Sequence, residues 1–265
     1  MNETFSFKRF GLLFKKTILE QLLQIFGVFG VAMLATLIFY PPFDIKHINL
    51  GIQSDIFDMV LTVGTGCMAF LMFNHFSENA KGYNYLLLPS SYFEKWMVGF
   101  LMTAIFLIFY LIFFRIVDTH HVNALHKTVD LPTYLLDEYL QNTKKRIQIL
   151  QFDSFYPHRY IYMTFIGTGI IALGNLYIKK NAFVKICLIL VGLIWTFIYL
   201  DRYIFKLFFD NIGFKSISTD SVSLREGGTV AMPQVFAKGF DILYQLVFPS
   251  ILWLIALIRL REKEI

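Results

Sequence analysis

The stretch MVGFLMTAIFLIFYLIFFRIV, residues Met97–Val117, decides the fold class of this chain. Its single charged residue, Arg115, stands close to its end. A helix needs about 20 apolar residues to cross the ~30 Å hydrocarbon layer of a bilayer. A helix in a soluble protein seldom stays apolar on every side. Met97–Val117 is therefore predicted to be a membrane span.

Five further apolar stretches of similar length flank this one, and charged segments separate them. The six predicted spans are Gln21–Tyr40, Ile56–Phe76, Met97–Val117, Tyr160–Ile178, Phe183–Leu200 and Phe240–Ile258. Hydrophobic residues make up 56% of the chain and charged residues 16%, whereas average globular chains carry about 25% charged residues. The expected fold class is all-α: a polytopic helical membrane protein with one membrane-embedded domain over residues 1–265.

An amphipathic helix is predicted before the first span, within residues 1–20. Its apolar face over Thr4–Glu20 consists of Phe7, Phe10, Phe14 and Ile18, at spacings of three and four, with lysines and an arginine around the rest. Such a helix lies in the membrane interface with its lysines towards anionic headgroups. The alternative is a basic flank that only fixes the orientation of the first span.

The distribution of Lys and Arg predicts the orientation of the chain. Six spans place both termini on one side, and basic residues are densest near the span ends of that side, which favours cytoplasmic termini. Lys144, Lys145 and Arg146 oppose this orientation. The bias accounts for the net charge of +5, so no nucleic-acid partner is needed.

Two long outer loops follow from this topology, 118–159 and 201–238. The first is expected to contain a helix that starts near Pro132. His120, His121 and His126 cluster with Asp118 in this loop, and a solvated loop is favoured there over a metal site. In the second loop, Tyr203–Phe214 is aromatic and either dips into the outer leaflet or packs on the surface. The remainder, around Ser216–Gly228, is polar and rich in turn residues.

Signatures of catalysis are absent from the sequence. It contains no HExxH, GxSxG or Walker A motif, and no catalytic, cofactor-binding or metal-ligating residue is predicted. Cys67 and Cys187 both lie inside apolar spans, so a disulfide framework is not expected. The charged residues of the spans stand near their ends, which counts against a proton-coupled carrier; these are Asp55, Asp58, Arg115, Asp201, Arg202 and Asp241.

Small residues gather in the second and fourth predicted spans. Such residues let helix backbones approach closely, so these two spans are expected to be central in the bundle. The sequence leaves two roles open for them with equal weight, close helix packing and the lining of a transport pathway. The candidates are Gly64, Thr65, Gly66, Gly167, Gly169 and Gly174.

The segment between the second and third spans, Asn74–Trp96, combines polar, apolar and turn residues. Pro89 stops a short apolar run, and Ser90 or Ser91 can cap a new helix with Glu94 in its first turn. The segment is either a docking site for a soluble partner or an interfacial turn that only connects two spans. The docking candidates are Glu78, Lys81, Gly82, Tyr83, Leu87, Leu88, Pro89, Glu94 and Lys95.

Three segments of the sequence resemble those of a known protein family. KGYNYLLLPSSYFEKW, residues 81–96, resembles the LLLPAS…EKF segment of ABC-2-type ABC transporter permease-like membrane proteins of Bacteroidetes-like bacteria. TFSFKRFGLL (4–13) and RLREKEI (259–265) resemble the two ends of those proteins. Length and number of spans match over the whole chain, whereas the outer loop 118–159 is long for that family.

The resemblance implies a permease subunit of an ATP-driven transporter, an exporter rather than an importer, in the bacterial cytoplasmic (inner) membrane. Residues 4–20 would form an elbow helix, residues 78–96 a coupling segment that docks on an ABC ATPase subunit, and residues 203–236 re-entrant half-helices. ATP and Mg would bind to that ATPase and no cofactor to this chain, which is not itself an enzyme. A second permease chain would complete the pathway.

Two other functions stay open from the sequence. One is a non-transporting membrane scaffold or sensor that binds a partner through its outer loops. The other is an ion-coupled carrier, against which the lack of ionisable residues inside the spans counts.

Overall fold

The structure is a computed structural model, and it describes residues 5–40, 50–76, 85, 87–129, 149–152, 155–178, 181–209, 214–217, 221–224, 229–231, 239 and 242–264. Its helices are α1 (Phe7–Glu20), α2 (Leu22–Phe39), α3 (Leu50–Phe73), α5 (Tyr92–Val129), α7 (Phe155–Tyr177), α8 (Ala182–Phe209) and α10 (Phe248–Glu264). A 3₁₀ turn over Asn74–Phe76 ends α3, and a π-helix over Leu243–Val247 precedes α10. Three short strands are β1 (Phe214–Ile217), β2 (Ser221–Leu224) and β3 (Thr229–Ala231).

Four of the helices in the described ranges are long and apolar enough to cross a membrane. They are Leu22–Phe39, Ile52–Phe76, Tyr92–Leu125 and Tyr160–Tyr177, which correspond to the first four predicted spans. The fifth predicted span falls on α8, whose apolar part Ala182–Leu193 is shorter. The sixth falls on the π-helix and α10. The apolar helices fit a membrane protein.

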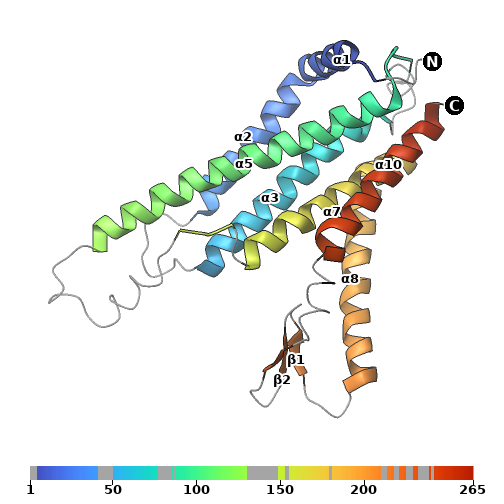
Figure 1. Cartoon of the computed structure of the whole chain (residues 1–265). Helices are drawn as coiled ribbons and strands as arrows, with labels where there is room; N and C mark the ends of the chain where they lie inside the picture. Colours follow the sequence, from blue (N-terminus) through green and yellow to red (C-terminus); the bar gives the residue numbers. More distant parts are fainter. Residues whose placement is uncertain are drawn as a thin grey trace.

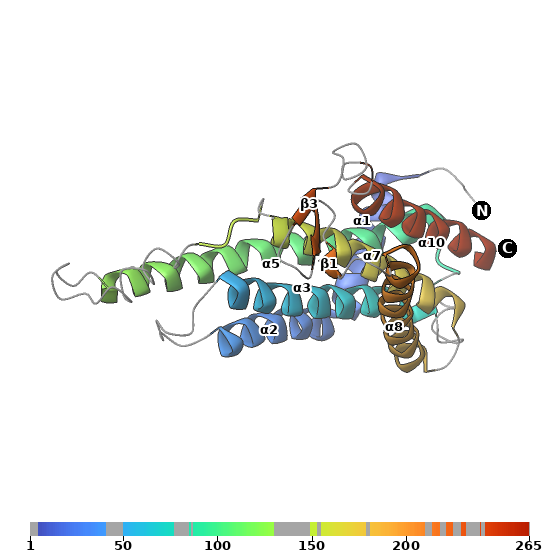
Figure 2. The same cartoon turned by 90° about the horizontal axis from the view of Figure 1, so that it is seen from below.

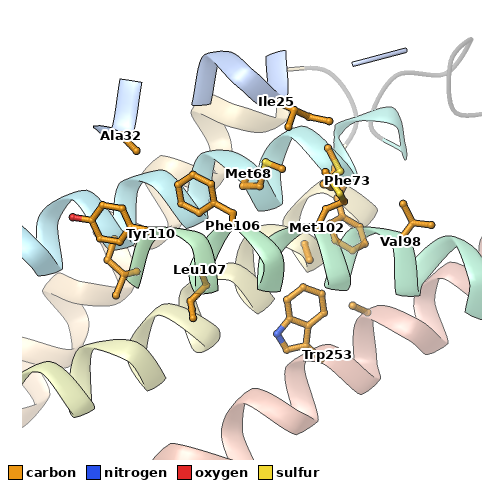
Figure 3. Close-up of a cluster of buried hydrophobic side chains, with 14 of the residues drawn as sticks. Ile25, Ala32, Met68, Phe73, Val98, Met102, Phe106, Leu107, Tyr110 and Trp253 are labelled. Atoms are coloured by element: carbon orange, nitrogen blue, oxygen red, sulfur yellow. The ribbon is translucent and has the colours of Figure 1, made fainter. Parts of the chain in front are cut away.

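Helices α3 and α7 are central, as the small residues predict. Among the described residues, the contact between α3 and α7 is the most extensive one between helices, and α3 also packs on α2 and α5 while α7 packs on α10. Aromatic side chains fill the space between α3, α5 and α10, where the Trp253 ring lies 5.9 Å from that of Phe73 (Figure 3). Both views show α8 leaving the bundle at a steep angle (Figures 1 and 2).

The third span is longer than predicted, because α5 continues past Val117 to Val129. Val122 and Leu125 are buried at helical spacing and pack against Ile149. The outer loop therefore does not begin at residue 118. The helix expected near Pro132 lies outside the described residues.

The expectation for 201–238 is corrected in two respects. Residues 201–209 belong to α8, so the fifth helix extends beyond Leu200. The described residues that follow form the antiparallel sheet β1–β2–β3, not re-entrant half-helices, so the fold is not purely α. Alternating serine, valine and threonine, which suit a pleated strand, explain this local structure.

Helix α1 covers Phe7–Glu20, within the range predicted for the amphipathic helix. Phe10, Phe14 and Ile18 pack against the core, and Leu13 is buried between them and α5. Phe7, on the same predicted apolar face, is 83% exposed.

Candidate functional site

The turn between α3 and α5, residues 87–91 and called here the α3–α5 turn, is fixed to α5 by a capping box. The Glu94 backbone N–H donates to Ser91 Oγ over 3.2 Å, and the Ser91 N–H donates to Glu94 Oε2 over 2.9 Å. This reciprocal pair satisfies two N–H groups at the start of a helix. The prediction that a serine caps a new helix with Glu94 in its first turn is confirmed.

Glu94 also ties α1 to α5. Its second oxygen, Oε1, accepts a hydrogen bond of 2.8 Å from the Ser6 N–H and one of 3.2 Å from Arg9 Nη2. The Glu94 side chain is completely buried. A buried carboxylate is tolerated when it is paired and hydrogen-bonded, and here a single carboxylate joins the first residues of two helices that are distant in sequence.

The structure separates the predicted docking residues into three groups. Glu94 and Lys95 are buried, so the prediction that they contact a partner is corrected, because neither offers surface to one. Leu87 is 79% exposed, Pro89 is exposed and Leu88 is half-buried. Glu78, Lys81, Gly82 and Tyr83 lie outside the described residues.

The start of α1 and the end of α10 lie at this end of the bundle, called here the terminal end (Figure 1). Lys263 Nζ, near the end of α10, donates to the Phe76 carbonyl over 2.9 Å, and the Arg261 guanidinium lies over the Tyr92 ring. Tyr85, which precedes the turn, stacks on His75, and burial raises its pKa to about 12. The residues that flank the α3–α5 turn thus contact α1, the end of α3 and α10.

The small residues of α3 and α7 lie at four different helix contacts. A Cβ on Gly64 would meet the Phe106 ring of α5, and one on Gly66 would meet Ile171 of α7. On α7, Gly169 faces Leu252 of α10 and Gly174 faces Ile186 of α8. Thr65 is buried and donates to the Leu61 carbonyl. Gly64, Gly66, Gly169 and Gly174 thus stand at close helix contacts, whereas a Cβ on Gly167 would meet nothing within 4 Å.

Replacing Gly64 with alanine is expected to lower the free energy of unfolding by about 1–3 kcal/mol, the usual cost of overpacking a core. The added methyl would lie 2.7 Å from Cζ of Phe106, which is itself buried. The measurement is thermal unfolding of the purified protein in detergent. Gly30→Ala is the control, because its Cβ meets nothing within 4 Å; equal shifts for both variants would contradict this packing.

A buried polar network lies at the opposite end of the bundle, and the sequence did not predict it. Asp118 is completely buried in α5. It accepts hydrogen bonds from the Tyr40 hydroxyl at the end of α2 and, over 2.7 Å, from the Leu150 N–H. Arg115 Nη1 donates to the Leu150 carbonyl over 2.6 Å. The network joins α2, α5 and the segment 149–152.

One prediction is corrected by this network. Asp118 does not belong to a solvated loop, because it is buried in α5, near the end of the candidate span Tyr92–Leu125. His121 lies edge-on to the Tyr40 ring, at 4.8 Å between centroids. Within the described ranges, no group of three His, Cys, Asp or Glu side chains could hold a metal ion.

Comparisons with known proteins found no relative of this chain. No family model, no curated protein and no solved structure matches the chain.

Proposed function

We propose that this chain is the permease subunit of an ATP-driven transporter, with the α3–α5 turn as the contact for a separate ATPase. The observation that supports this best is an exposed leucine on a rigidly held turn. Leu87 is 79% exposed, while Ser91 and Glu94 of the same connection are buried and bonded to α5 and α1. A few residues that fill pockets of the partner supply most of the binding energy of an interface, and Leu87 offers an exposed side chain for such a contact.

The attachment of the turn explains how such a contact would drive a conformational change. A force on Leu87 passes through the capping box to α5, which extends from the terminal end to Val129. Through Glu94 it also reaches α1. Binding can shift the helices only if the ATPase contacts two states of the turn with different affinity.

The remaining parts of the proposal concern topology and assembly. The shorter apolar part of α8 and the π-helix with α10 are the fifth and sixth spans, and α1 lies in the interface. The terminal end faces the cytoplasm of a bacterium, and export is favoured over import. Two permease chains and two ATPase chains form the transporter, and ATP and Mg bind to the ATPases.

Replacing Leu87 with aspartate is expected to abolish recovery of the ATPase while the fold is preserved. The exposed side chain contributes to the contact and not to the core, and a carboxylate at the centre of an apolar contact is left unpaired. The measurement is a mild-detergent pull-down of the tagged chain from its native host. The control is Leu19→Asp on α1, which is 62% exposed.

Two outcomes would contradict the proposal. Equal recovery of an ATPase with wild type and with Leu87→Asp would show that the ATPase contacts another part of the chain. A preparation without any ATPase, under conditions that preserve other membrane complexes, would favour the scaffold or sensor.

The buried carboxylate at the opposite end favours a second candidate, an ion-coupled carrier. Buried ionisable side chains of membrane helices are costly and commonly mark ion or proton pathways, and Asp118 is buried near the end of the candidate span Tyr92–Leu125. This candidate predicts transport that collapses with the proton gradient and survives loss of ATPase activity. The ATP-driven permease predicts transport that survives loss of the proton gradient and stops when ATPase activity is lost.

A further inference from the structure

A narrow groove runs between α2 and α3, which lie side by side in the bundle (Figure 2). Its floor consists of buried residues where the two helices meet, among them Ala32 of α2 and Val60 and Gly64 of α3. Exposed valines form its two lips, Val31 on α2 and Val63 on α3. The groove is therefore open on its outer side and closed at its base.

The groove lies at the depth of the hydrocarbon layer. Its lining on α2, Gln24–Phe39, falls within the candidate span Leu22–Phe39, and its lining on α3, Met59–Leu71, falls within Ile52–Phe76. Apart from one glutamine and one cysteine, the lining residues are apolar or glycine. Water finds almost no hydrogen-bond partner in such a space, and apolar cavities stay dry. The lining thus favours a hydrocarbon occupant.

The dimensions of the groove distinguish a lipid chain from a helix. From Gln24 to Phe39 the groove follows α2 for about 22 Å. Spread over that length, its volume of about 480 Å³ gives a mean cross-section of about 20 Å². A helix with its side chains is about 10 Å wide and needs about 80 Å². A helix therefore does not fit, whereas an extended hydrocarbon chain is a single methylene wide.

The lips of the groove also disfavour a second helix. Membrane helices approach closely where small residues stand at the contact. Here the small residues Ala32 and Gly64 lie on the floor, while the exposed positions of the lips carry Val31, Met59 and Val63. Methionine adapts its shape to an irregular or mobile neighbour, which suits a flexible chain.

We propose that this groove binds one long acyl chain of a membrane lipid. The chain would lie between α2 and α3, with its polar end at the Gln24 amide near the terminal end. A chain that leaves the bilayer for the groove stays in an apolar environment, so contacts along its length supply the binding. The inference requires only that the protein is embedded in a membrane, so it holds whether or not Leu87 contacts an ATPase.

The test is a titration of the purified full chain in detergent with palmitoyl lysophosphatidylcholine, which carries a single long acyl chain, followed by native mass spectrometry. Saturable binding is expected. Palmitoyl lysophosphatidylglycerol should bind equally well, and octanoyl lysophosphatidylcholine much more weakly. Gly27→Leu is expected to weaken the binding about fivefold, because Gly27 lines the groove and a leucine there takes the place of several methylenes and their contacts.

The matched control is Gly30→Leu, the same substitution in the same helix at a glycine outside the groove. At both glycines a Cβ would meet nothing within 4 Å, so both variants are expected to fold. The unmodified chain gives a second readout, because Cys67 lines the groove and Cys187 does not. The palmitoyl lipid should slow the reaction of N-ethylmaleimide with Cys67 and leave that with Cys187 unchanged.

Four results would overturn the proposal. Equal binding by wild type and Gly27→Leu would place the lipid elsewhere. Equal losses in Gly27→Leu and Gly30→Leu would show an effect on α2 as a whole. Equal binding of the palmitoyl and octanoyl lipids would show that a long chain is not recognised. A wild-type dimer that Gly27→Leu separates into single chains, measured by light scattering, would assign the groove to a helix of a second copy.

Discussion

Replacing Glu94 with alanine is expected to lower the free energy of unfolding by about 3–5 kcal/mol, the cost of removing one partner from a buried ion pair. The variant leaves the Ser6 and Ser91 N–H groups without their acceptor and removes the ion pair with Arg9. Thermal unfolding of the purified protein in detergent measures the effect. Glu94→Gln should lie between wild type and alanine, because it keeps the shape and an acceptor oxygen.

The matched control is Glu20→Ala, which removes an exposed carboxylate of α1 that pairs with Lys16. An exposed pair of this kind contributes about 0–1 kcal/mol. Equal shifts for Glu94→Ala and Glu20→Ala would contradict the bonding scheme at Glu94. The prediction also shows that a change at Glu94 is unsuitable for mapping a partner, because it would disturb the junction of α1 and α5.

Replacing Asp118 with alanine is the second large expected effect, also about 3–5 kcal/mol. The Tyr40 hydroxyl and the Leu150 N–H would both lose their acceptor, and each buried group left unsatisfied costs about 1–3 kcal/mol, more when the lost partner was charged. Asp118→Asn should be milder, because one amide oxygen remains. Thermal unfolding in detergent again measures the effect.

A double-mutant cycle with Tyr40→Phe tests the pairing itself. Residues that share a hydrogen bond show coupling energies of about 0.5–3 kcal/mol, so the two substitutions should not be additive. The control, Asp55→Ala, removes an exposed carboxylate near the same end of α3 and should cost less than about 0.5 kcal/mol. Additive effects of Asp118→Ala and Tyr40→Phe would contradict the network.

Local signals in the sequence predicted much of this fold. Apolar length marked the first four spans, which the structure confirms as candidate membrane helices. The Ser91–Glu94 capping box was predicted because its partners stand three residues apart, within one helical turn. The central place of α3 and α7 followed from their glycines, which need only a neighbour of any kind to pack closely.

Contacts between distant segments could not be predicted in the same way. Glu94 is bonded to Ser6 and Arg9 of another helix, and no spacing rule relates such positions. Asp118 was misjudged because a charged residue after an apolar run usually marks the end of a span. The buried Val122 and Leu125 that follow at helical spacing were the signal that α5 continues.

The central claim is that Leu87 contacts an ATPase, and site-specific photocrosslinking tests it most directly. A photoreactive amino acid would replace Leu87 in the native host, with Leu34 on α2, also exposed but within a candidate span, as the control position. The account predicts that only the probe at Leu87 forms an adduct with a protein that carries a nucleotide-binding ATPase domain. Adducts from Leu87 with lipid alone, or the same adducts from both positions, would contradict it.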